Sequence, residues 1–286
     1  MPREPTTSWG MSRQIEQRYA RSLQKLRRMI MGQLRGATIP EEISRRLRVI
    51  QNRPEFVTFV ESMATNMAQQ VGRQTSRQWR ANAQRSNRLR SDLIFQGLMS
   101  DMDNPFIGGA IRDIVLNNAS LIKTIPNRLD REMTTLMAQK SAYAGLRSDD
   151  LTQEILGQFD HLLEWQARRI ARTETAKAQS ALTQVRSVYV GAKWYVWRTA
   201  ADGERVRESH RHMEGVLVHW SEPPSPEALA GKSTVGFYHA GNIYNCRCYS
   251  QVLLDIDDVS WPHKVLYGGN IVTMQRQEFL HLYNAA

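Results

Sequence analysis

Apolar residues recur at helical spacing through most of the first two thirds of the chain. A single stripe between residues 11 and 36 predicts an amphipathic helix. This stripe contains Ile15, Tyr19, Leu23, Leu26, Ile30 and Leu34. Pro40, followed by two glutamates, suits the first turn of a second helix, and Pro54 opens a long polar one. Helical spacing resumes over 110–146 and 149–190, so both parts are expected to be mainly helical.

From residue 193 onward the period of the pattern changes to two. Large residues alternate over 194–197, Asp202-Gly203 offers a turn, and residues 205–207 continue the pattern. This order predicts a β-hairpin, since Asp-Gly tolerates the positive φ that tight turns need. Further short strands are predicted at 216–218, 236–238 and 249–253. We therefore predict an α+β fold, with a small mixed α+β domain after the helices.

Gly and Pro divide the chain into candidate domains. The clearest interruption runs from Asp103-Asn104-Pro105 to Gly108-Gly109. The predicted division is a basic helical arm over 1–109, a helical middle over 110–192, a small α+β core over 193–258 and a C-terminal tail over 259–286.

The positive charge is concentrated in the first part of the chain. Residues 1–90 hold 18 Lys and Arg against 6 Asp and Glu, whereas residues 151–286 hold 14 of each. Lys25 is the one lysine among those 18 bases, and arginine grips phosphate or carboxylate bidentately. The arm is therefore expected to bind double-stranded DNA without reading its sequence, or an acidic protein surface; the alternative is a solvated helical face. The candidate DNA-binding residues are Arg73, Arg77, Arg80, Arg85 and Arg88.

Composition limits the class of protein. With 41% hydrophobic and 23% charged residues the chain has the composition of a globular protein. The chain contains no apolar run of about 18 residues, so no membrane-spanning helix is predicted. The N-terminus lacks the apolar region of a signal peptide. The chain is expected to be made in a cytosol-like environment and to stay soluble there.

Cys246 and Cys248, the two cysteines of the chain, are separated by one residue. Such a pair rarely closes a mutual disulfide, so free thiols, metal ligands or a packed local feature are the expectations. With His210 or His212, and with His239, they would form a Cys₂His or Cys₂His₂ set for tetrahedral Zn²⁺. On a strand, His210 and His212 would point to one face. The alternative is a metal-free, hydrogen-bonded cluster that fixes the hairpin against the C-terminal strand.

Several motifs occur in a recognisable order along the second half of the chain. They are Ile170-Ala171-Arg172-Thr173-Glu174, Trp194, Asp202-x-x-Arg205-Val206-Arg207-x-x-His210, Met213-x-Gly215 and Asn245-Cys246-Arg247-Cys248. In this order and spacing, residues 115–252 resemble the Mu F-like phage head morphogenesis domain. Two features depart from that pattern: the second histidine, His212, and His239-Ala240-Gly241, where the family more often has proline and glycine.

The resemblance implies a low-copy minor head protein of a tailed bacteriophage, without enzymatic activity. Its implied partners are the portal protein, capsid or scaffold proteins and packaged DNA. Its implied location is the virion, inside the head near the portal vertex, after assembly in the host cytoplasm. Arg172 and Glu174 lie on different faces of a helix. They are expected to pin it to the hairpin, for instance through Asp202 or Arg207.

Two enzymatic alternatives remain at this point. A metal-dependent nuclease packaged with the genome would use the histidines and Asp202 beside the hairpin. A zinc deaminase would use His212-Met213-Glu214, but the spacing of Cys246 and Cys248 misplaces the second cysteine for that site.

Overall fold

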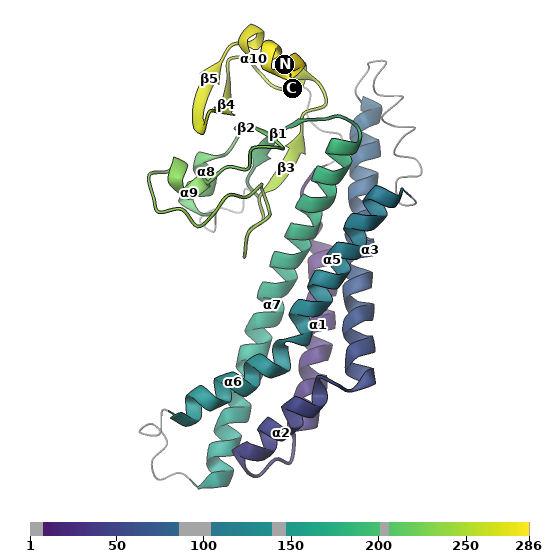
Figure 1. Cartoon of the computed structure of the whole chain (residues 1–286), viewed down its shortest axis with the longest axis vertical. Coiled ribbons are helices and arrows are strands. Elements are labelled where there is room, and N and C mark those ends of the chain that lie inside the picture. The colour runs from purple at the N-terminus through teal and green to yellow at the C-terminus, as the bar shows by residue number, and fades with distance from the viewer. Residues whose placement is uncertain (1–7, 86–103, 139–146, 201–205, 286) are drawn as a thin grey trace. The chain divides into compact units, whose positions relative to one another are not determined.

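The computed structural model describes residues 8–85, 104–138, 147–200 and 206–285. In the described residues, the helices that precede the sheet are α1 (Arg13–Leu34), α2 (Pro40–Ile50), α3 (Pro54–Arg85), α5 (Pro105–Lys123), α6 (Ile125–Ala138) and α7 (Ser148–Tyr189) (Figure 1). The remainder holds β1 (Trp194–Arg198), α8 (Glu208–His212), β2 (Leu217–His219), α9 (Pro226–Leu229), β3 (Tyr249–Val252), η4 (Ile256–Asp258), β4 (His263–Tyr267), β5 (Asn270–Met274) and α10 (Arg276–Ala285). The predicted α+β class is confirmed.

Contacts group the chain into two compact units. The first comprises residues 1–13, 69–111 and 172–286, and the second comprises 14–68 and 112–171. Neither unit is continuous in sequence, because α3 and α7 each contribute to both. The four consecutive domains predicted above stay a prediction. The last of them, the expected tail over 259–286, supplies β4, β5 and α10.

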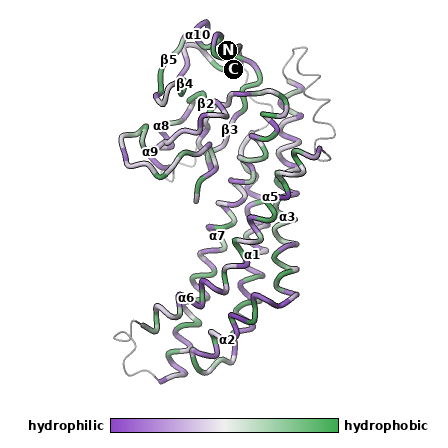
Figure 2. Tube along the Cα trace, viewed as in Figure 1, coloured by the Kyte–Doolittle hydropathy of each residue, from purple (hydrophilic) through white to green (hydrophobic). Residues whose placement is uncertain are grey.

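The second unit is held together by the stripe that the sequence pattern predicts. All six apolar residues of that stripe on α1 are buried, and hydrophobic and hydrophilic positions alternate along the helices in Figure 2. Arg27 on α1 forms an ion pair with Asp160 on α7, at 2.5 Å between Nη2 and Oδ2. Arg48 pairs with Asp130 at 3.1 Å. Some arginines of the basic arm therefore have structural partners within the chain.

Polar side chains join α3 to α7 in the first unit. Gln179 on α7 donates hydrogen bonds to Gln78 Oε1 and to the Trp9 carbonyl, both at 2.9 Å. The fully buried Arg186 donates to Thr75 Oγ1 at 2.7 Å and to the Gly72 carbonyl at 3.2 Å. These hydrogen bonds explain how a stretch of α3 with few apolar residues packs against α7.

The five-stranded sheet has the order β3-β1-β2-β4-β5. β1 pairs antiparallel with β2 and β3, β2 pairs parallel with β4, and β4 pairs antiparallel with β5. Both faces of β1 are covered: Trp194 belongs to a hydrophobic cluster with Phe279 of α10, whereas Trp197 belongs to one with Cys246 and Cys248. This second cluster positions the candidate site.

The predicted hairpin is wrong in its second strand. β1 pairs with β2 and β3, so a buried strand already has a partner on each side. Arg207 instead precedes α8, and its carbonyl accepts from the Arg211 N–H at 2.9 Å. The predicted turn over 201–205 lies outside the described residues. The strands predicted at 216–218 and 249–253 match β2 and β3 closely, whereas 236–238 forms no strand.

Among the described helices, none combines the length and apolar character that crossing a membrane requires.

Candidate metal centre

Three side chains with metal-binding atoms converge beside the sheet. His210 comes from α8, and Cys246 and Cys248 come from the segment that leads into β3. His210 Nδ1 lies 3.5 Å from Cys246 Sγ and 3.3 Å from Cys248 Sγ. All three residues are buried, both cysteines are free, and their ligand atoms lie within 4.8 Å of one another. Among the described residues, this is the one cluster of His, Cys, Asp or Glu that fits a metal ion.

The segment before Cys246 is hydrogen-bonded to α7. Asn245 has a φ of +54°, a left-handed conformation that asparagine tolerates better than most residues. Its side-chain oxygen accepts from Arg172 Nη1 at 2.7 Å, and its N–H donates to Thr173 Oγ1 at 2.9 Å. The backbone of Gly241, at φ +85°, packs directly against that of Cys248. A Cβ at position 241 would lie 2.8 Å from the Cys248 carbonyl oxygen, so only glycine fits there. These contacts position the two cysteines.

A hydrogen-bonded chain extends from the far side of the imidazole. His210 Nε2 lies 3.0 Å from the Tyr238 hydroxyl. That hydroxyl lies 2.7 and 2.8 Å from the two carboxylate oxygens of Glu227 on α9. Ser209 also donates to Glu227, at 3.1 Å. Ser209, Glu227 and Tyr238 were not predicted from the sequence. They belong to no spaced motif, and Glu227 and Tyr238 are distant from His210 along the chain.

The electrostatics of the cluster follow from these contacts. The contacts with Cys248 and then with His210 lower the pKa of Cys246 despite its burial, while the contact with Cys246 and burial raise the pKa of Cys248. Burial alone would raise the pKa of Glu227, but hydrogen bonds from Tyr238 and Ser209 hold it below its usual value. Burial and the neighbouring Glu227 raise the pKa of Tyr238. Glu227 is therefore ionised and Tyr238 protonated at neutral pH.

The other two histidines of the candidate ligand set lie elsewhere. His212 is exposed on α8, because a helix turns residues two apart to different faces. The strand geometry assumed for this pair was therefore wrong. His239 lies 3.1 Å from the Tyr195 hydroxyl through Nδ1, and its ring packs edge-on against Trp220. The structure thus brings His210 together with both cysteines and places His212 and His239 apart from them.

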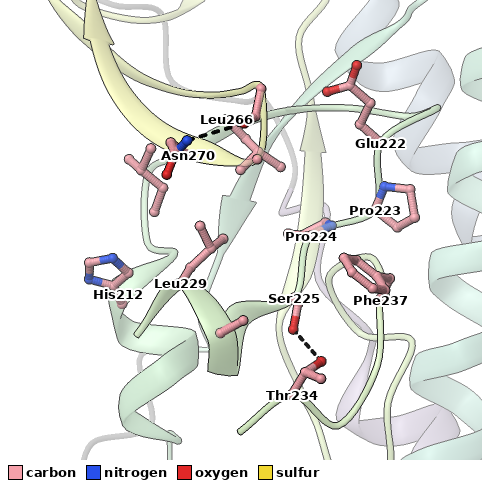
Figure 3. Close-up of a pocket in the computed structure, with 14 residues that line it drawn as sticks. His212, Glu222, Pro223, Pro224, Ser225, Leu229, Thr234, Phe237, Leu266 and Asn270 are labelled. Carbon is pink, nitrogen blue, oxygen red and sulfur yellow. Dashed lines mark hydrogen bonds between the residues drawn. The ribbon is translucent and has the colours of Figure 1, made fainter. Parts of the chain in front are cut away.

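His212 instead lines a separate pocket of about 760 Å³. In Figure 3, His212 and Leu229 lie on one side of this pocket, and Pro223 and Phe237 lie on the other. A second cavity, of about 300 Å³, adjoins the cluster of His210, Cys246 and Cys248, which all line it.

The remaining motif residues surround the loop before Cys246. Arg207 donates to the Tyr244 carbonyl at 3.0 Å, and its guanidinium lies 4.5 Å from the centre of the Tyr244 ring. Glu174 lies 3.7 Å from Lys177 on the same helix. With Arg172 bound to Asn245, α7 is linked to this loop, whereas the predicted partner was the hairpin. Asp202 and Arg205 lie outside the described residues.

The candidate DNA-binding arginines lie along α3. Arg73 and Arg77 are exposed and Arg80 is half-buried. Arg85 ends the helix, and its side chain is not described; Arg88 lies outside the described residues. A second basic row, which the site prediction left out, occupies the exposed face of α1 and the residue that follows it. It consists of Arg18, Arg21, Lys25 and Arg28 on the helix and Arg35 directly after it.

Comparison with known proteins identifies this region. Residues 134–251 match the family model described as Phage Mu protein F like protein. An uncharacterized protein of Haemophilus influenzae is 30% identical over 177 residues, which make up 62% of this chain and 35% of that relative. The chain thus spans about a third of the relative's length. No solved structure matches the chain. The resemblance inferred from the ordered motifs is confirmed over residues 134–251, which are similar to the Phage Mu protein F like family.

Proposed function

We propose that this chain is a minor head protein of a tailed bacteriophage that takes part in head morphogenesis. The observation that carries this proposal is the family match over residues 134–251, which includes all of α7 and β1 and both cysteines. The proposed location is inside the head, near the portal vertex, after assembly in the host cytoplasm. The proposed protein partners are the portal and neighbouring capsid or scaffold proteins.

The head assignment can be tested on particles of a phage that encodes this chain. We expect quantitative mass spectrometry to find the chain in purified heads at few copies per particle. Cross-linking should connect it to the portal protein. Comparison of full particles with particles that have ejected their genome would show whether the chain leaves with the DNA. Its absence from both assembling and mature heads would contradict the proposal.

The second part of the proposal is that exposed arginines hold duplex DNA through its phosphates. The rows on α1 and α3 support it, because Arg73 and Arg77 on α3 and the basic residues of α1 are exposed and closely spaced along each helix. Binding to phosphates positions a protein on DNA without reading its sequence, which suits a packaged genome. An acidic protein surface, such as that of a portal subunit, would be the alternative partner of the same rows.

We expect the joint replacement Arg73→Ala, Arg77→Ala and Arg80→Ala to weaken duplex binding by the full chain. The slope of log K against log salt should become shallower by about 0.9 for each phosphate that the variant no longer binds. Fluorescence anisotropy with labelled duplexes of unrelated sequence would measure both effects.

A matched control removes three arginines elsewhere: Arg168→Ala, Arg211→Ala and Arg276→Ala. This control removes the same charge and should retain the salt slope of the unaltered chain. Equal slopes for both triple variants would contradict phosphate binding by α3. No duplex binding at about 50 mM salt would assign the basic rows to an acidic protein instead.

The nuclease alternative gains no specific support from the described residues. The cluster offers two thiolates and an imidazole, whereas the Mg²⁺ and Mn²⁺ ions of many nucleases prefer oxygen ligands. We therefore expect no plasmid cleavage with Mg²⁺, Mn²⁺ or Zn²⁺ above that of a His210→Ala variant.

A further inference from the structure

We propose that His210, Cys246 and Cys248 bind a Zn²⁺ ion, with water from the adjoining cavity as the fourth ligand. The inference is independent of the role in the phage head and rests on four features of the cluster.

The first feature is the separation of the ligand atoms. Zinc–sulfur bonds of about 2.3 Å and zinc–nitrogen bonds of about 2.05 Å at a tetrahedral angle place nitrogen and sulfur about 3.5 Å apart. The corresponding distances from His210 Nδ1 are 3.5 Å to Cys246 Sγ and 3.3 Å to Cys248 Sγ. Small side-chain adjustments would therefore suffice for the ion to bind all three atoms.

The second feature is the tautomer of His210. The Tyr238 hydroxyl has one proton and donates it to the Glu227 carboxyl group, so this hydroxyl accepts a hydrogen bond from His210 Nε2–H. Nδ1 of a neutral imidazole then carries the lone pair, and it faces both sulfur atoms. A carboxylate that orients a histidine in this way, here through a tyrosine, is a common support for a zinc ligand.

The third feature is the choice of ligand atoms. Two thiolates and one imidazole favour Zn²⁺ over Mg²⁺, Ca²⁺ or Mn²⁺, which prefer oxygen. The cavity of about 300 Å³, which the three ligands line, provides space for water at the fourth position.

The fourth feature is the chain around the cluster. Between β2 and β3, α9 is the sole helix or strand, and it is four residues long. A zinc ion would cross-link α8 to the end of this irregular segment. Metal binding of this kind stabilises small domains whose loops form few regular hydrogen bonds.

The direct test is the zinc content of the full chain, purified from zinc-containing medium without chelators. Elemental analysis should give about one zinc per chain, as expected for a single site. Cys246→Ser, Cys248→Ser and His210→Gln should each lose the zinc. The matched control, His212→Ala, changes an exposed histidine on the same helix and should retain it.

Cobalt provides a readout that does not depend on how the variants fold. The unaltered chain, stripped of metal and given Co²⁺, should develop thiolate-to-cobalt charge-transfer bands and the visible bands of tetrahedral cobalt. A folded chain without these bands, or with zinc well below about 0.2 equivalents, would overturn the proposal. The cluster would then be a metal-free, hydrogen-bonded packing feature.

Tyr238→Phe tests the orienting role of the tyrosine. This variant should still bind zinc, but chelator competition should show an affinity about 10-fold to 100-fold lower. Unchanged affinity would contradict the proposed orientation of His210 by Tyr238.

Discussion

Asn245 shows how one residue can connect a helix to the cluster. Its backbone is left-handed, its side chain accepts from Arg172, and its N–H donates to Thr173. We expect Asn245→Ala to lower the free energy of unfolding by about 1–3 kcal/mol, through backbone strain and the missing hydrogen bond. Urea denaturation would measure the change.

Asn245→Gly separates these two causes. Glycine adopts the same φ without strain but keeps no side-chain acceptor, so its loss of stability should be smaller than that of Asn245→Ala. Equal stability of the alanine variant and the unaltered chain would show that the side chain of Asn245 contributes nothing.

His239 provides a pH-dependent prediction. Burial lowers its pKa from 6.5 to about 4. Below pH 6.5 the unfolded chain therefore takes up a proton at His239, whereas the folded chain does so only near pH 4. The free energy of unfolding should fall over this range as pH decreases, by about 3 kcal/mol at most.

Denaturation of the unaltered chain and of His239→Gln between pH 7 and pH 4 would test this expectation. The variant should lose much of the pH dependence, whereas His212→Gln, at an exposed position, should keep it. The same slope in all three proteins would contradict the assignment to His239.

At the scale of elements, the pairing of α3 with α7 depends on buried polar groups. We expect Arg186→Met to lower the free energy of unfolding by about 2 kcal/mol or more. Methionine fills similar space but donates nothing to Thr75 Oγ1 or to the Gly72 carbonyl. Arg211→Met, at an exposed position, should change stability by less than about 0.5 kcal/mol. Comparable effects in thermal or urea denaturation would contradict a special role for Arg186.

The element that sequence reasoning misassigned is α8. A turn signal at Asp202-Gly203 and alternation on both sides favoured a hairpin. Local periodicity contains no information about which strands will flank β1, and β2 and β3 occupy both its edges. This difference changes the site. On a helix the side chains of His210 and His212 point to different faces, whereas on a strand they would point to the same face.

At the scale of the whole molecule, the proposed DNA-binding row on α3 and the proposed zinc site use different residues. We expect the triple variant of Arg73, Arg77 and Arg80 to retain its zinc. We expect Cys246→Ser, where circular dichroism shows it folded, to retain duplex binding. Elemental analysis and anisotropy on the same preparations would measure both properties. Loss of both properties in either variant would show that the two functions are coupled.

The sequence by itself determined the helices of the first half, the α+β class and the resemblance to the Mu F-like family. Each of these depends on residues close together in the chain or on motifs in a fixed order, such as Asn245-Cys246-Arg247-Cys248. The tertiary structure alone decided which histidine joins the cysteines and what orients it. Tyr238 in a loop and Glu227 on α9 lie far from His210 along the chain, so their contacts with it depend on strand order and helix placement. Spacing in the sequence specifies neither of these.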